Sequence, residues 1–336
     1  MHMSDALLSV AVGGAMAAAS AGAIGYSIKK IDKVELGGNK IPMMGVMGAF
    51  VFAAQMINFT IPVTGSSGHI GGGILLAALL GPFPALITLA SVLLIQCLFF
   101  ADGGLLALGC NIFNMAVIPC LIIYPLIYKP MLKKKLTPGR ISAAAVISVI
   151  IGLQLGAFGV VLETLASGIT ELPFTSFVAL MQPIHLAIGI VEGVATAAVL
   201  CFIYNIRKDV LEDALGFKNA AAGSRKNVLI IMTVAALLVG GIFSWFASSN
   251  PDGLEWSMEK VAGTTELSTD SGVHAAVEKV QQNTAILPDY AFKSEGSEKA
   301  GTSVSGIVGG IFTLILATLV GGIITILKKI RKPATE

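Results

Sequence analysis

Charged residues are scarce in this chain, and histidines and cysteines are scarcer still. Of its 336 residues, 12% are charged, four are histidine and four are cysteine. Because an ordinary soluble domain carries about 25% charged residues, this composition excludes one. No short pair spacing joins the cysteines, Cys97, Cys110, Cys120 and Cys201. Their spacing therefore predicts neither a disulfide framework nor a cysteine metal site.

The signatures of several enzyme classes are also missing. The chain contains no GxxxxGK[ST] phosphate loop, no HExxH and no GxSxG, so nucleotide hydrolysis and the usual hydrolytic reactions are not expected of it. Its basic clusters lack interleaved aromatic residues, which argues against a nucleic-acid surface. The first residues carry Asp5 and no basic region, so no cleavable signal peptide is expected.

Long apolar stretches dominate what is present. Apolar residues make up 55% of the chain, and runs long enough to span a bilayer recur along it. We predict an all-α fold, a polytopic transmembrane helical bundle. The predicted spans are 5–26, 41–57, 70–82, 84–101, 104–128, 141–167, 174–206, 227–247 and 304–327.

The basic residues predict the orientation of these spans. Eighteen of the 22 follow spans one, five, seven and nine, and the other four lie within 248–303. The positive-inside rule therefore places the eighteen in the cytoplasm, and it places Met1 and the segment 248–303 outside. This parity requires three crossings within 70–128. The result is nine helices, with the amino terminus outside and the carboxyl terminus inside.

The polar stretch after the seventh span divides the chain. We expect a seven-helix substrate-binding unit at 1–206, a cytoplasmic linker at 207–226 and a two-helix hairpin at 227–336. The hairpin carries the extracytoplasmic loop 248–303, which is acidic and holds His274. We expect this histidine to be solvated.

Met1 and His2 place three nitrogens along one short stretch. These are the α-amine of Met1, the amide nitrogen of His2 and the imidazole of His2. If all three face one metal, a fourth nitrogen completes a square plane, which Ni²⁺ and Cu²⁺ favour. A lone polar cluster in a membrane protein usually marks function. The alternative is a start codon followed by an arbitrary second residue.

His69 is the natural fourth nitrogen. It lies in the Gly- and Ser-rich stretch 58–73, on the same outer side as Met1. Irregular backbone at membrane depth must be buried in protein or line a cavity, so we expect this stretch to fold into the bundle. The alternative is a loop histidine that caps the next helix. A site of this kind predicts metal uptake that weakens as the pH falls below the usual imidazole pKa of about 6.5.

Other polar residues within or beside the spans have two interpretations each. Asp5 either accepts a hydrogen bond from a ligand imidazole or caps a helix. His185 either supports the site from a second shell or makes a helix–helix hydrogen bond. Glu192 is a functional candidate as an intramembrane acid, although pairing with Gln154 or Asn114 would explain it.

Several motifs in order resemble one family of membrane proteins. They are Met-His-Met-Ser-Asp at 1–5, Gln-Met-Ile-Asn at 55–58 leading to His69, Phe-Ala-Asp-Gly-Gly from Phe100, Asn-Ile-Phe-Asn at 111–114, and Pro183 through Glu192. They resemble the nickel/cobalt substrate-binding subunits of energy-coupling-factor (ECF) transporters. The hairpin with Pro-Asp-Gly-Leu-Glu-Trp at 251–256 is similar to their two-helix accessory subunit, here fused to the same chain.

The resemblance implies a function and a set of partners. It implies Ni²⁺ or Co²⁺ as the transported ion, bound by Met1, His2 and His69. Around these ligands we expect Asp5, Asn58 and His185 as a second shell. It also implies a transmembrane coupling subunit, two cytoplasmic ATPase subunits and a place in the bacterial cytoplasmic membrane. Two alternatives remain: an ATP-independent metal carrier or channel, and a membrane-embedded metalloenzyme that uses His69, His185 and Glu192.

Overall fold

The computed structural model describes residues 1–31, 36, 40–217, 225–265, 267, 272–293 and 297–331. Residues 218–224 of the predicted linker lie outside the described residues, as do parts of the segment 248–303. The helices of the first unit are α1 (Val10–Lys30), α2 (Lys40–Gln55), α3 (Gly73–Leu80), α4 (Pro82–Phe100), α5 (Leu108–Ile112), the π-helical η2 (Phe113–Tyr128), α6 (Lys129–Leu132), α7 (Pro138–Ser167) and α8 (Phe174–Leu215).

The prediction of a largely α-helical membrane protein is confirmed. Six described helices are long and apolar enough to cross a membrane, and α2 and α9 (Lys226–Gly241) are shorter apolar helices. α4 is mostly buried among its neighbours, whereas α1 is apolar but mostly exposed. In water such an exposed apolar helix would be unfavourable, but lipid accommodates it.

The third predicted span is a helix over only part of its length. α3 has eight residues, which corresponds to about 12 Å at 1.5 Å per residue. The expected helix 70–82 is therefore wrong in its first turn, because the helix begins at Gly73 and Gly72 has a left-handed conformation. Before it, β1 (Phe59–Ile61) and β2 (Ser66–Gly68) form an antiparallel hairpin that the all-α prediction missed. β2 and His69 are buried, whereas Val63 in the turn of the hairpin is fully exposed.

The carboxyl-terminal part packs directly onto the first unit. α9 and α12 (Glu298–Arg331) lie against α2. Their own contact is close at Gly306, where a Cβ atom would lie 2.3 Å from the carbonyl oxygen of Gly240. Between them run η3 (Phe243–Phe246), α10 (Gly253–Ala262), α11 (Gly272–Thr284) and η4 (Pro288–Tyr290).

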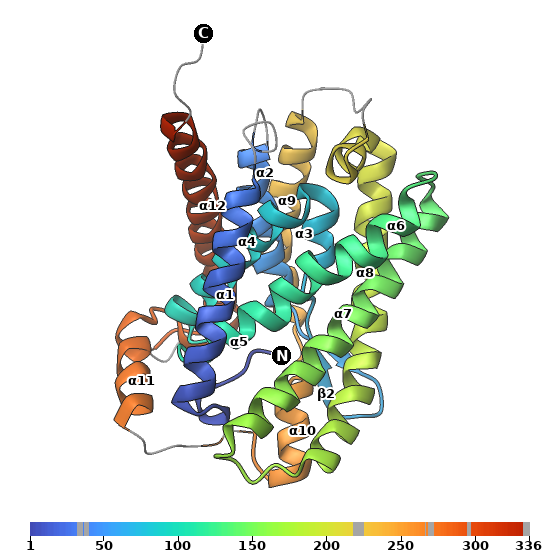
Figure 1. The fold of residues 1–336 in the computed structure, drawn as a ribbon. Helices are drawn as coiled ribbons and strands as arrows, with labels where there is room; N and C mark the ends of the chain where they lie inside the picture. The colour runs from blue at the N-terminus through green and yellow to red at the C-terminus, as the bar shows by residue number, and fades with distance from the viewer. Residues whose placement is uncertain are drawn as a thin grey trace.

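The two ends of the bundle differ in what they carry. Figure 1 shows β2, α10 and α11 toward one end, with the amino terminus above them, and the last turns of α12 at the other end. This is the arrangement that the predicted orientation requires. It brings the segment after α9 close to the start of the chain, although about 250 residues separate them.

Candidate metal site

The amino terminus is folded back into the protein, where it meets His69. The amine of Met1 lies 2.8 Å from Nε2 of His69, and both residues are buried. Nδ1 of His69 donates to the carbonyl oxygen of Ile70 at 3.3 Å, which leaves Nε2 with the lone pair that faces the amine. Nitrogens at neighbouring corners of a square plane lie about 2.8 Å apart when each metal–nitrogen bond is about 2.0 Å. The observed contact is a hydrogen bond from the amine to the imidazole, and its length equals the spacing of neighbouring ligands of one ion.

Side chains from two helices hold the backbone that carries His69. Gln55 of α2 donates to the carbonyl oxygen of Gly71 at 2.8 Å, and Glu192 of α8 accepts from the N–H of Gly72 at 3.0 Å. Gly72 has a φ of 78°, a conformation that other residues rarely adopt. Glu192 thus fixes the backbone of the His69 loop. Neither Gln154 nor Asn114 is its hydrogen-bond partner in the structure.

His2 lies beside His69. Their rings are stacked with centroids 5.0 Å apart and an interplanar angle of 16°. Nδ1 of His2 contacts the carboxylate of Asp102 at 3.1 Å, and Nε2 is buried without a hydrogen-bond partner in the structure. Asn111 fixes the next residue through two hydrogen bonds with the backbone of Met3, at 2.8 and 3.2 Å. These contacts hold the first turn of the chain against the bundle.

The segment after α9 completes the surroundings of the amine. A carboxylate oxygen of Asp252 lies 2.5 Å from the Met1 nitrogen. The other oxygen caps α10 by accepting from Leu254 and Glu255, and the Glu255 side chain accepts from the backbone of Asp252 in return. This reciprocal pair is a capping box. It holds the Asp252 carboxylate in place toward the amine.

Further contacts join the same segment to the site. The Pro251 carbonyl accepts from the N–H of Ser67, and the Trp256 indole donates to the Thr64 carbonyl, so α10 is attached to the β-hairpin. From η4, the hydroxyl of Tyr290 donates to the second oxygen of Asp102 at 2.5 Å. The carboxylates beside Met1 and His2 are thus both held by the carboxyl-terminal part of the chain.

Burial determines the charge of the site. Burial, assisted by the positive amine, lowers the pKa of His2 and of His69 to about 3. Burial also acts on Asp252, but the amine outweighs it and lowers the pKa of that carboxyl. Both imidazoles are therefore neutral at pH 7, as metal ligation requires. These lowered pKa values do not support the expectation that imidazole protonation near pH 6.5 limits uptake.

The remaining predicted residues make hydrogen bonds to backbone groups of other segments. Asp5 accepts from the backbone N–H of Ala107 at 2.9 Å, and the carboxylate at the His2 ring is that of Asp102. Asn58 offers its backbone carbonyl to the N–H of Ser248. His274 is buried and its Nε2 bonds the carbonyl of Leu8 at 2.8 Å. The prediction that it is solvated is wrong, because α11 packs against the start of the chain.

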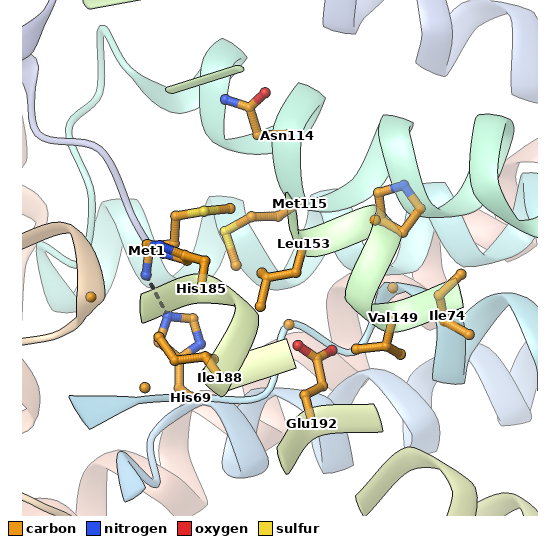
Figure 2. Close-up of a pocket in the computed structure, with 16 residues that line it drawn as sticks. Met1, His69, Ile74, Asn114, Met115, Val149, Leu153, His185, Ile188 and Glu192 are labelled. Carbon is orange, nitrogen blue, oxygen red and sulfur yellow. Dashed lines mark hydrogen bonds between the residues drawn. The ribbon is translucent and has the colours of Figure 1, made fainter. Parts of the chain in front are cut away.

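His185 does belong to the surroundings of Met1. A cavity of about 40 Å³ is bordered by Met1, His69, His185, Glu192 and the apolar side chains around them. Figure 2 shows Met1, His69 and His185 near one another, with Glu192 further along. The volume suffices for a single ion or water. Among the described residues, no three His, Cys, Asp or Glu side chains form a metal-binding group, so a site here depends on backbone nitrogen.

Sequence reasoning missed Asp102 and Asp252. Asp102 follows a predicted span and precedes two glycines, and Asp252 begins an Asp-x-x-Glu capping pattern. That pattern predicts a helix start. Neither pattern indicates which distant group the free carboxylate oxygen contacts.

The fold and the site together define a polytopic integral membrane protein with two neutral histidines buried against its own amino terminus. Residues 2–210 match the family described as the cobalt uptake substrate-specific transmembrane region, and residues 226–326 match the PDGLE domain. The chain belongs to this cobalt uptake family and carries the PDGLE domain in fusion with it.

Similar proteins agree with this assignment. A relative from Archaeoglobus fulgidus, named as a fused nickel transport protein, is 33% identical over 94% of this chain and 96% of its own length. The fused nickel transport protein of Rhodobacter capsulatus is 26% identical over 96% of each chain. The crystal structure of a transition metal transporter superposes with a TM-score of 0.53 and 32% identity, covering 62% of this chain and 94% of that one. The chain is a nickel/cobalt-type transport protein and not an enzyme.

Proposed function

We propose that this chain is the substrate-binding subunit of an ATP-driven ECF-type transporter that imports Ni²⁺, or alternatively Co²⁺. The ion would be bound by the amine of Met1, the amide nitrogen and imidazole of His2, and Nε2 of His69. The contact of 2.8 Å between the amine and His69 supports this most directly. The names of the fused relatives favour Ni²⁺.

Binding would replace protons with the ion. The amine donates to His69 and Asp252 when no ion is present, and it must lose a proton to become a ligand. The amide nitrogen of His2 must lose one as well. The two imidazoles are already neutral and release none. The metal site therefore becomes available when the Met1 amine and the amide nitrogen of His2 each lose a proton. The ion then replaces Asp252 as the partner of the amine.

We further propose the division of labour within the chain. Residues 1–206 form the metal-binding unit, 207–226 a cytoplasmic linker and 227–336 an accessory hairpin whose outer segment 248–303 loads or gates the site. The contacts of Asp252 and Tyr290 support that role. The chain would act in the bacterial cytoplasmic membrane with a transmembrane coupling subunit and two ATPase subunits, because it carries no phosphate loop of its own.

Reconstitution into vesicles tests this function. We expect vesicles that hold the chain with its coupling and ATPase subunits to accumulate ⁶³Ni²⁺ when ATP is supplied on the cytoplasmic face. Vesicles that hold the chain alone should bind the ion but not accumulate it. Equal accumulation by the chain alone would instead identify an ATP-independent carrier.

A further inference from the structure

Gln96 is a buried amide whose oxygen has no partner. The residue lies in α4 and is fully buried. Its Nε2 lies 3.3 Å from the hydroxyl oxygen of Tyr290, and that hydroxyl donates its own proton to Asp102. Since the hydroxyl proton is already used, the hydroxyl must accept from Gln96, which places the donating end of the amide at Tyr290. The oxygen Oε1 therefore faces elsewhere, and it has no hydrogen-bond partner in the structure.

The amide of Gln96 interacts with the ring of His2. Burial and the Met1 amine lower the pKa of His2 to about 3, whereas the Gln96 side chain raises it. Because a protonated imidazole only donates, the end of the amide that has this effect is its oxygen. Nδ1 of His2 contacts Asp102 at 3.1 Å, and Nε2 is buried without a hydrogen-bond partner in the structure. Two neighbouring side chains thus each keep one buried polar atom unpaired.

These two unpaired atoms suit each other. Leaving a buried polar atom unpaired costs about 1–3 kcal/mol. Thr88 and Ser91 of the same helix avoid this cost, because their hydroxyls donate to carbonyl oxygens one turn earlier. A proton on Nε2 of His2 would let that nitrogen donate to Oε1 of Gln96 and would satisfy both atoms. The two free atoms therefore indicate a second state in which they meet.

Metal binding by His2 supplies that state. The amide nitrogen and Nδ1 of one histidine can hold the same ion, because the atoms between them close a six-membered ring with it. Nε2 lies on the far side of the imidazole and points away from that ion. A neutral ring whose Nδ1 binds a metal carries its proton on Nε2. The ion therefore replaces Asp102 at Nδ1 of His2, and it leaves an N–H at Nε2 that needs an acceptor.

We propose that Gln96 is the positioning residue of His2. In the loaded site its Oε1 accepts from the Nε2–H of His2 and holds the ring with Nδ1 toward the ion. This inference rests on the proposed function. His69 already has an equivalent partner, since its Nδ1 donates to the carbonyl oxygen of Ile70. Tyr290 of the accessory part fixes the amide of Gln96, so both parts of the chain determine the orientation of His2.

Solid-state nuclear magnetic resonance of the full-length protein in vesicles tests the proposal without any substitution. The protein is labelled with ¹⁵N in the histidine rings and with ¹³C at the side-chain carbonyl of glutamine. After Ni²⁺ is added, we expect a dipolar contact between Nε2 of His2 and the Gln96 carbonyl carbon at about 3.7 Å, the separation that an N–H···O bond gives. Absence of this contact in the Ni²⁺-loaded protein would overturn the role of Gln96.

Variants of Gln96 give the second readout. Gln96→Met keeps the length of the side chain and removes the acceptor oxygen, so Ni²⁺ binding should weaken at least about tenfold. Gln96→Glu keeps an acceptor oxygen and should bind Ni²⁺ within about threefold of the wild type. Gln154→Met is the matched control, because Gln154 donates to the carbonyl oxygen of Gln182. Equal losses in the two methionine variants, or no rescue by Gln96→Glu, would contradict the proposal.

The failure of this inference differs from failure of the proposed function. If His69→Ala binds Ni²⁺ as tightly as the wild type, the four-nitrogen site itself is wrong. If His69→Ala loses binding but Gln96→Met binds normally and the loaded wild type shows no contact, only the role of Gln96 is wrong.

Discussion

The two imidazoles of the site are neutral because they are buried, and the only charge among the proposed ligands is that of the Met1 amine. Burial lowers the pKa of His2 and of His69 to about 3. A lowered histidine pKa means that protons compete for these nitrogens only in strong acid. Competition between pH 5 and 8 therefore comes from the backbone nitrogens, which each exchange a proton for the ion.

This predicts how Ni²⁺ affinity depends on pH. Two protons are released per ion, so the affinity should rise with pH by about 100-fold per unit and fall equally on acidification. No inflection should occur near pH 6.5. Calorimetric titrations at several pH values, in buffers of different ionisation enthalpy, measure both the slope and the protons released. Release of three or four protons near pH 6 would show that the imidazoles are charged in the empty site.

At the scale of elements, α10 and the β-hairpin are joined to each other beside the amine. The indole bond of Trp256 to Thr64 and the bond from the N–H of Ser67 to the Pro251 carbonyl attach them to each other. The approach is close at Gly253, where a Cβ atom would lie 2.8 Å from Ile188 and 3.0 Å from the His185 ring. A side chain at the first residue of α10 would therefore require Ile188 and the His185 ring to shift.

Gly253→Ala should accordingly detach α10 from the hairpin. Overpacking of this kind destabilises the packed position of α10 by about 1–3 kcal/mol. The amides of Gly253–Ala262 should therefore exchange hydrogen faster. Uptake should fall with it, since Asp252 is displaced from the amine. Gly272→Ala in α11 is the control, because a Cβ atom there meets nothing within 4 Å. Similar exchange and uptake in both variants would contradict the role of this contact.

Much of the element pattern follows from the sequence, because lipid forces backbone polar groups into helices and hydropathy marks where they lie. The same reasoning placed Met1 and His69 on one face. It failed at the start of α3, where Gly72 has a left-handed conformation and the helix begins only at Gly73. It also failed at Asp102, Asp252 and His274, whose partners are set by packing between distant segments.

The whole molecule is two parts held by packing as well as by the linker. α9 and α12 lie against α2, and a Cβ atom on Gly309 would overlap the Phe52 ring. The outer segment adds the ion pair at Met1 and the bond of Tyr290 to Asp102. The association therefore does not require a continuous chain.

Cutting the chain between residues 217 and 225 tests this. Two separately encoded pieces, 1–217 and 225–336, should purify together and bind Ni²⁺ with an affinity within about tenfold of that of the intact chain. The affinity falls because the linker no longer raises the effective concentration of one piece beside the other. Gly309→Leu in the second piece should prevent the association. If the unaltered pieces fail to purify together, the linker and not the packing holds the two parts.

The central claim is that the amine of Met1 is a ligand, and Ni²⁺ binding by a protein with a blocked terminus tests it most directly. The purified chain should be compared with one that carries Gly-Ser-Gly-Ser before Met1, and with one that carries the same residues at the carboxyl end. The extension at Met1 should weaken binding at least about a hundredfold and remove the four-nitrogen spectrum, whereas the carboxyl-terminal extension should change neither. Unchanged Ni²⁺ affinity and spectrum with Met1 extended would contradict the account.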